Sequence, residues 1–163
     1  CEVLESCITR IGELNPKINA FCATSFDRAR KEARLAEQAI LRGEPGGILR
    51  GLPIGIKDLE ETEGLLTTYG SPLYRANVPA RDNELVHRLR QAGAIVVGKT
   101  NVPEMGAGAN TRNAVWGATG NPFNPELHAG GSSGGPAAAL PASMVPLCSG
   151  SNPGCSLRIP ASK

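Results

Sequence analysis

AGGSSGGPAAAL, residues 129–140, places two serines between two pairs of glycines and continues into a run of small residues typical of a helix. Glycine- and serine-rich runs are also common in flexible linkers. By itself the stretch therefore fits a linker, a phosphate-binding loop or part of a catalytic site. The segments that stand at fixed distances from it distinguish these three interpretations.

Two segments near the start of the chain carry apolar residues at helical spacing. The first covers residues 3–14, and Pro16 is expected to close it. The second covers residues 26–40, with Ser25 as its expected cap and Gly43 as its expected end. Its expected inner face consists of Phe26, Ala29, Ala33, Ala36 and Ile40.

A third helix is expected to begin after Asp82, its N-cap, and to end at Gly93. Its expected inward-facing residues are Leu85, Val86 and Leu89. A fourth helix, rich in alanine, follows the quoted glycines. Apolar runs typical of buried strands stand between the helices, at 18–24, 52–58, 94–98 and 144–150. Helices that alternate with buried strands predict an α/β fold.

Length, composition and charge limit the class of protein. The chain has 163 residues, within the usual span of one domain. Aromatic residues make up only 4% of it, which argues against a surface for stacking nucleic-acid bases. Its net charge of +2 is too small to indicate binding to nucleic acid or to an anionic membrane. We therefore expect neither partner.

The cysteine pattern favours a reducing, cytoplasmic environment. The five cysteines include no C-x-x-C pair, and no histidine stands near them at the spacing of a zinc site. No apolar run approaches the roughly 20 residues of a membrane span, and the N-terminus lacks a signal pattern. The chain begins at Cys1 and stops within a patterned segment, so we expect a fragment of a longer protein.

Two familiar motifs account poorly for the glycines and serines. A P-loop requires a lysine after its last glycine, and none follows Gly135. GSSGG also matches the nucleophile elbow G-x-S-x-G, with Ser133 as nucleophile, but an elbow needs a preceding strand and a later histidine. Residues 121–129 do not resemble a strand, and both His87 and His128 lie upstream. The elbow interpretation is disfavoured.

Six segments together resemble the amidase signature family over nearly the whole chain. The resemblance implies the N-terminal portion of that α/β fold, with a mixed β-sheet core covered by helices. It also implies that residues 1–163 form a single incomplete amidase domain without its C-terminal part. The segments are GLPIGIKD at 51–58, TTYGS at 67–71, RLRQAGAIVVGKTNVPE at 88–104, WGATGNPFNP at 116–125, GGSSGG at 130–135 and GSNPGCSLRIPA at 150–161.

The resemblance implies a Ser-Ser-Lys catalytic triad. Ser156 is the implied nucleophile, Lys57 the implied base, and Ser132, which follows a cis peptide bond in the family, the implied proton relay. The chemistry suits these residue types, because a serine hydroxyl needs a positioned base and a neutral lysine can replace histidine. Desolvation lowers a lysine pKa, so Lys57 is expected to be buried. Taken alone, an ordinary surface lysine would be the default interpretation.

The resemblance also implies an oxyanion hole, in which backbone N–H groups just before the nucleophile stabilise charge on the carbonyl oxygen. Gly154 and Cys155 are the expected contributors, with Gly131 and Ser133 on the glycine-rich segment. The family usually has Asp-Thr-Gly-Gly before its serine, whereas this chain has Asn152, Pro153, Gly154 and Cys155. Proline has no N–H to donate. Weak activity is therefore expected.

The implied reaction is the hydrolysis of a small-molecule carboxylic amide through an acyl-serine intermediate, without a cofactor or metal. One alternative is the amidase-like subunit of a tRNA-dependent glutamine amidotransferase, with protein and tRNA partners. The RIP sequence at 158–160 resembles general amidases more than the RQP associated with that kind of protein. A second alternative is a non-catalytic or decayed fragment, to which the departures at Asn152, Pro153 and Cys155 point.

Overall fold

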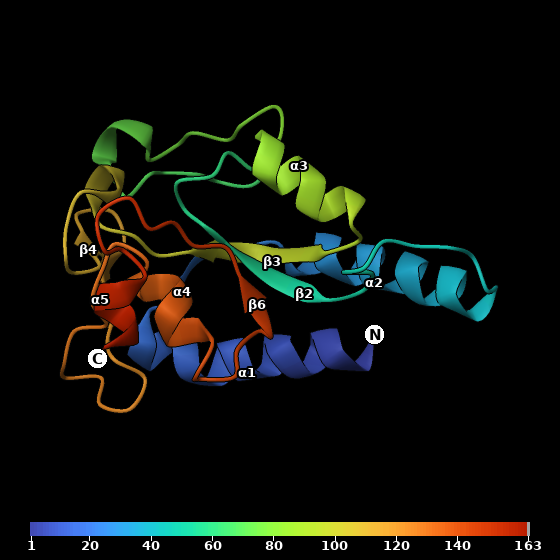
Figure 1. Cartoon of the computed structure of the whole chain (residues 1–163), viewed down its shortest axis with the longest axis horizontal. Helices are drawn as coiled ribbons and strands as arrows, with labels where there is room; N and C mark the ends of the chain where they lie inside the picture. Colours follow the sequence, from blue (N-terminus) through green and yellow to red (C-terminus); the bar gives the residue numbers. More distant parts are fainter. Residues whose placement is uncertain (163) are drawn as a thin grey trace.

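The computed structural model describes residues 1–162 and contains a four-stranded sheet with helices on both faces (Figure 1). Its strands are β1 (Phe21–Thr24), β2 (Pro53–Lys57), β3 (Ile95–Thr100) and β6 (Leu147–Cys148). Their spatial order is β1-β3-β2-β6. β2 runs parallel to β3 and β6, whereas β1 is antiparallel to β3. The sheet is therefore mixed, and the α/β prediction is confirmed.

The core consists of two apolar clusters, one on each face of the sheet. Along β3, Ile95 and Val97 join a cluster with α1 (Glu2–Ile18), α2 (Phe26–Leu41) and α4 (Gly134–Ala139). Val96 joins the other cluster, with Val86 of α3 (Glu84–Gln91). Successive side chains of a strand point to opposite faces, and Figure 1 accordingly shows α3 above the sheet and α1 and α4 below it.

Short elements complete the description. They are the 3-10 helices η1 (Pro72–Tyr74) and η2 (Glu104–Gly106), the paired strands β4 (Arg112–Asn113) and β5 (Gly117–Ala118), and the terminal helix α5 (Arg158–Ala161). Within residues 1–162, no helix combines the length and apolar character needed to cross a membrane.

The first helix continues through Pro16 and ends at Ile18, so the expectation that Pro16 closes it is wrong. Asn15 stabilises this end: its side chain accepts a hydrogen bond from the Phe21 N–H at 2.7 Å and donates one to the Phe21 carbonyl at 2.9 Å. Asn19 then terminates the helix with a φ of 54°, a left-handed conformation that asparagine tolerates. As a result β1 begins only at Phe21.

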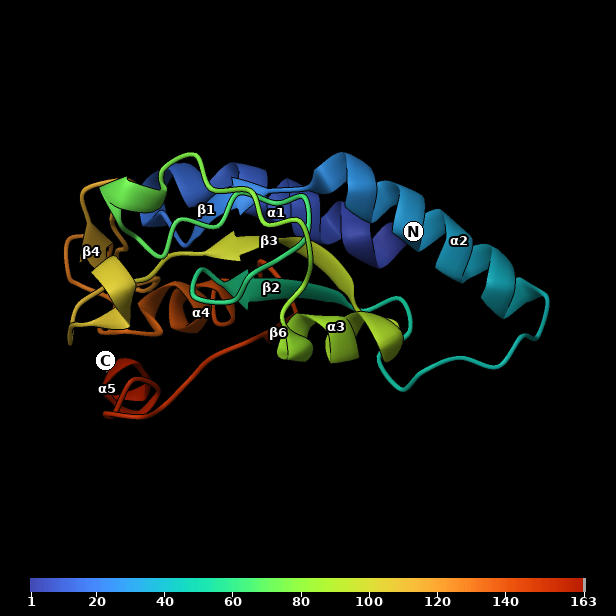
Figure 2. The same ribbon diagram turned by 90° about the horizontal axis from the view of Figure 1, so that it is seen from above.

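The second helix has the expected bounds, but its C-terminal half projects beyond the sheet (Figure 2). Ala29 and Ala33 are buried as expected, whereas Ile40 is 54% exposed. Ser25 occupies the N-cap position without capping the helix, because its hydroxyl donates to the Val96 carbonyl at 2.9 Å. That bond joins the helix to β3 instead.

The third helix is capped by Asn83 and not by Asp82. The Asn83 side chain accepts from the Val86 N–H at 3.0 Å, while Asp82 pairs with Arg90 at 2.9 Å. Val86 is buried and Leu89 packs against the core, but Leu85 is exposed. The buried face of α3 is therefore narrower than the spacing of its apolar residues predicted.

Candidate active site

Lys57 is the last residue of β2, which lies between β3 and β6 in the sheet. Parallel neighbours on both sides bury β2, and the Lys57 side chain is completely inaccessible to solvent. The Lys57 N–H donates to the Ser149 hydroxyl at 2.8 Å, which joins the end of β2 to the segment after β6. The sheet thus fixes the position of one buried amine.

The glycine-rich segment is an ordered turn that leads into α4, and the linker interpretation is wrong. Gly130 has a φ of 74°, and the Gly131–Ser132 peptide bond is cis. A Cβ on Gly131 would lie 2.9 Å from the backbone nitrogen of Asn110, and one on Gly135 would overlap the backbone of Asn101. Glycines here allow the segment to approach other backbone closely, which brings both serines to Lys57.

The structure brings the three predicted triad residues together. Lys57 Nζ lies 3.0 Å from Ser132 Oγ and 3.1 Å from Ser156 Oγ. The oxygens of Ser132 and Ser156 are 2.7 Å apart. All three side chains are buried, so a proton can pass between them without crossing bulk water.

Two further serines contact the same amine. Ser133 Oγ lies 2.8 Å and Ser151 Oγ 2.9 Å from Lys57 Nζ, and Ser133 Oγ is also 2.8 Å from Ser156 Oγ. The Ser133 N–H donates to the Ser156 carbonyl at 3.2 Å. This N–H is therefore not free to bind a substrate oxygen, contrary to the expectation that Ser133 contributes to the oxyanion hole. Ser151 was missed by the sequence analysis. We call Ser132, Ser133, Ser151 and Ser156 the serine cluster.

Burial sets the ionisation of Lys57. Desolvation lowers the pKa of this amine from the ordinary value of 10.5 to about 8. Four serine oxygens surround Nζ, whereas an ammonium has only three N–H bonds to donate. A neutral amine donates two hydrogen bonds and accepts one, so it suits a cluster whose hydroxyls can also donate.

A second buried lysine belongs to a separate network. Lys99 Nζ donates to the Glu60 carbonyl and, at 3.0 Å, to the Thr62 hydroxyl, and it lies 3.9 Å from Asp58 Oδ1. Asp58 in turn accepts from the Thr68 hydroxyl at 2.6 Å. The lysine of GKTN therefore stabilises the turn after β2 and does not form a phosphate loop.

A cavity of about 510 Å³ opens onto the serine cluster. Ser132, Ser151 and Ser156 are among its lining residues. Its remaining lining residues are Leu59, Met105, Gly106, Gly108, Ala109, Pro153, Gly154 and Ile159. The backbone N–H groups of Gly154, Cys155 and Ser156 have no acceptor among the described residues, so they are free to bind a ligand beside Ser156.

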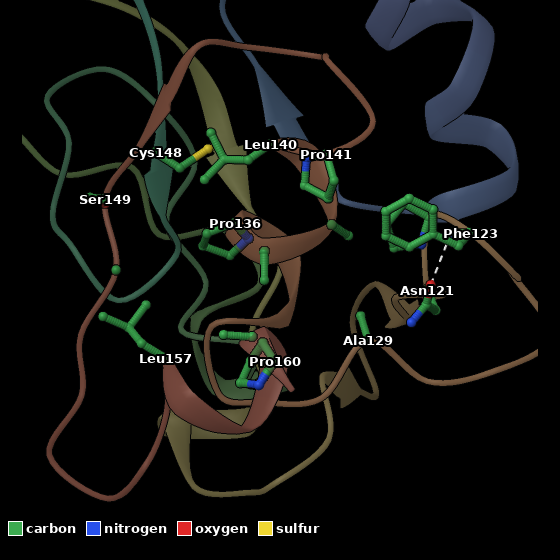
Figure 3. A pocket seen from close by; sticks show the side chains of 15 residues that line it. Asn121, Phe123, Ala129, Pro136, Leu140, Pro141, Cys148, Ser149, Leu157 and Pro160 are labelled. Atoms are coloured by element: carbon green, nitrogen blue, oxygen red, sulfur yellow. Dashed lines mark hydrogen bonds between the residues drawn. The ribbon is translucent and has the colours of Figure 1, made fainter. Parts of the chain in front are cut away.

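A second cavity, of about 600 Å³, lies between α4, α5 and the start of the segment after β6 (Figure 3). Its lining is mostly apolar, and of the serines discussed only Ser149 reaches it. Phe123 lines this cavity and is 81% exposed. The serine cluster faces the other cavity.

Comparison with known proteins identifies the family of the chain. A profile of the family described as Amidase matches residues 2–163. The chain belongs to the amidase family. A glutamyl-tRNA(Gln) amidotransferase subunit from Alkaliphilus metalliredigens is 42% identical over 160 residues, which cover 98% of this chain and 33% of that protein. The amidase chain thus spans about a third of the length of this curated relative.

Solved amidase structures superpose closely on it. A bacterial aryl acylamidase of the amidase signature family has a TM-score of 0.91 at 37% identity, covering 98% of this chain and 34% of its own. A 6-aminohexanoate cyclic dimer hydrolase complexed with substrate has a TM-score of 0.89 at 36% identity, covering 99% and 32%. The fold is therefore that of the corresponding part of an amidase.

The turn before Ser156 carries the residues that depart from the Asp-Thr-Gly-Gly pattern that the resemblance implies. Cys155 has a φ of 65°, in the left-handed region that favours glycine. Asn152 accepts from the Leu157 N–H at 2.9 Å through its side chain, which closes the turn around Pro153. Pro141 lies beyond the C-cap of α4 at Leu140, so it does not interrupt that helix. Among these residues, only Cys155 therefore adopts a backbone conformation that costs free energy.

Proposed function

We propose that this amidase hydrolyses carboxylic amides through an acyl-enzyme on Ser156. The observation that carries the proposal is the buried Lys57 amine, whose nitrogen lies within hydrogen-bonding distance of both Ser132 and Ser156. Burial lowers the pKa of Lys57 to about 8, so a fraction of the amine is neutral near pH 7 and can act as the base that activates a serine without a histidine.

The proposed reaction begins with attack of Ser156 Oγ on the carbonyl carbon of the amide. The Ser156 proton moves to Ser132 Oγ while the Ser132 proton moves to Lys57 Nζ, across contacts of 2.7 and 3.0 Å. The negative carbonyl oxygen accepts hydrogen bonds from the free N–H groups of Gly154 and Cys155. The proton on Lys57 then returns through Ser132 to the leaving nitrogen, which departs as ammonia or an amine.

Water completes the cycle by the reverse proton path. A water molecule loses its proton to the Ser132 and Lys57 pair and attacks the acyl carbon, and Ser156 leaves with its proton restored. Every proton that Lys57 takes up is given back within the cycle. No group beyond those already described is required for this sequence.

A fluorophosphonate probe and an amide panel test the proposal together. We expect the probe to modify Ser156, located by peptide mass spectrometry, and Ser156→Ala to abolish both labelling and ammonia release from simple amides. Ser6→Ala is the matched control, because Ser6 is exposed and far from the cluster in sequence. Labelling at Ser133 would instead support the nucleophile-elbow interpretation, and no labelling at all would contradict the proposed reaction.

A second candidate function is that of a component of a glutamine amidotransferase. The 42% identity to a glutamyl-tRNA(Gln) amidotransferase subunit favours it. That function predicts glutamine as the preferred amide and transfer of ammonia within an assembly that includes protein and tRNA partners. Ammonia release from simple amides without glutamine preference would favour the hydrolase. All five cysteines are free thiols, which supports a cytoplasmic setting for either function.

A further inference from the structure

The cavity beside the serine cluster has a wall without charge. Its apolar side chains are Leu59, Met105 and Ile159, and the rest of its lining consists of glycines, Ala109, Pro153 and serines. In the part of the chain that the structure describes, no Asp, Glu, Lys or Arg lines this cavity. A charged end of a substrate would therefore find no counter-charge on this wall.

Charged residues next to the lining in sequence are turned elsewhere. Glu104 precedes Met105, but its carboxylate accepts a hydrogen bond from the Ser71 hydroxyl at 2.8 Å. Arg158 precedes Ile159 and is exposed on α5. Lys57 lies behind the serine cluster, and its nitrogen is surrounded by the four serine oxygens. None of the three is a lining residue of the cavity.

The backbone conformation of Met105 favours a role for this wall of the cavity in ligand binding. Met105 has a φ of 53°, a conformation that is uncommon for residues other than glycine and asparagine and that clusters at ligand sites. A hydrogen bond of 2.7 Å from the Met105 N–H to the Tyr69 carbonyl holds it. Met105 is nevertheless 56% exposed, so its side chain covers the cavity without being part of the core.

We propose that this cavity binds the acyl portion of the amide and selects uncharged acyl groups over acyl groups that end in a carboxylate or an ammonium. The inference rests on the proposed function, since it assigns the substrate class of the same site. The physical reason is that a charge moved from water to a wall without a charged partner loses part of its solvation. A volume of about 510 Å³ accommodates an alkyl or aryl acyl group.

Three alkyl fluorophosphonates of equal chain length test the selectivity. Their far ends are a methyl group, a carboxylate and an ammonium, and the chain mimics the acyl group of an amide. The rate of Ser156 modification is followed by intact mass and divided by the rate at which each probe hydrolyses in buffer. We expect the methyl probe to react at least about tenfold faster than either charged probe, since each 1.4 kcal/mol of differential binding is a factor of ten.

A charge placed on the wall should change this order. Met105→Lys is expected to accelerate the carboxylate probe about tenfold relative to the methyl probe, because it supplies the missing counter-charge. Leu73→Lys is the matched control, since Leu73 is 89% exposed on η1 and lines no part of the cavity. It adds the same charge to the protein without placing it at the site.

The outcomes separate the inference from the proposed function. If the charged probes modify Ser156 as fast as the methyl probe, the inference is wrong and the proposed function stands. If Met105→Lys changes the order no more than Leu73→Lys does, the acyl group does not lie against Met105 and the inference is also wrong. If no probe modifies Ser156, both the proposed function and the inference fail.

Discussion

Ser133 Oγ lies 2.8 Å from Ser156 Oγ, almost as close as Ser132 Oγ at 2.7 Å. Both Ser132 and Ser133 also contact Lys57 Nζ, at 3.0 and 2.8 Å. The structure therefore offers two hydroxyl bridges between the same pair of groups. The resemblance to the family assigns the proton relay to Ser132 alone. Substitution of each serine tests whether Ser133 can also relay the proton.

We predict that Ser132→Ala and Ser133→Ala each lower the rate of Ser156 modification less than the double variant does. Either hydroxyl can carry the proton when the other is absent, whereas the double variant leaves only the direct 3.1 Å contact between Lys57 and Ser156. General base catalysis is typically worth about 10²- to 10⁴-fold, and the double variant should lose a factor in this range. The measurement is the rate at which a fluorophosphonate labels Ser156 in each of the three variants.

One result would contradict the proposal that both serines relay the proton. If Ser133→Ala has no effect and the double variant equals Ser132→Ala, then Ser132 alone relays the proton. Lys57→Ala provides the reference, because it removes the base from every path. Groups that act as a unit give losses that do not add, so combining Lys57→Ala with either serine variant should cost little more than Lys57→Ala alone.

The pH dependence of labelling should report the ionisation of Lys57. Only the neutral amine has a lone pair for a proton, and burial lowers the pKa of Lys57 to about 8. The rate is therefore expected to be low at pH 6, to rise through an apparent pKa of about 8, and to level off above it. The measurement is the labelling rate at Ser156 across this range, corrected for probe hydrolysis.

Lys99 needs a control in this experiment, since burial also lowers its pKa to about 8. Its amine contacts Glu60 and Thr62 and not the serine cluster. Lys99→Met should therefore keep the same inflection in the labelling profile. A profile that is flat between pH 6 and 9, or one whose inflection disappears with Lys99→Met, would show that Lys57 is not the base.

The resemblance to the amidase signature family pointed to most of this arrangement. It assigned Lys57 through GLPIGIKD and Ser132 through GGSSGG, whereas the residues around Lys57 taken alone would have indicated an ordinary surface lysine. Ser151 was not assigned, because a serine in a loop has no spacing signature and its contact with Lys57 joins residues far apart in the chain. The N-cap was misplaced by one residue because Asp82 and Asn83 are both good capping residues, and the ion pair of Asp82 with Arg90 leaves the cap to Asn83.

Gly135 should be intolerant of a side chain. A Cβ there would overlap the backbone nitrogen and oxygen of Asn101 and lie 3.0 Å from the Ala20 carbonyl. Gly135→Ala is therefore expected to lower the free energy of unfolding by about 1 to 3 kcal/mol, the usual cost of overpacking. Gly154→Ala is the matched control, because nothing lies within 4 Å of its Cβ position. Urea unfolding measures both, and equal stabilities would mean that α4 does not pack against the end of β3 as described.

The protein should be less stable with Cys155 than with a glycine at the same position. Its φ of 65° lies in the left-handed region, where a residue with a Cβ incurs a cost of roughly 1 to 2 kcal/mol. We expect Cys155→Gly to raise the free energy of unfolding by about 1 kcal/mol after the added flexibility of the unfolded chain is counted. Cys155→Ala removes the thiol but keeps the Cβ, and it should give no such gain. Equal gains from both variants would attribute the effect to the thiol.

Pro153 should limit catalysis, because it lines the cavity beside Ser156 and has no N–H to donate. We predict that the combined variant Asn152→Asp, Pro153→Thr and Cys155→Gly raises ammonia release from simple amides by about 10²- to 10³-fold, the typical value of one oxyanion donor. Asp at position 152 keeps the acceptor that now binds the Leu157 N–H, so the turn should be preserved. Pro153→Ala is the decisive control: it restores the N–H without a hydroxyl and should account for most of the gain. If neither variant exceeds the unaltered chain, the N–H groups of Gly154 and Cys155 already suffice for the carbonyl oxygen, and the proline at 153 has no part in the reaction.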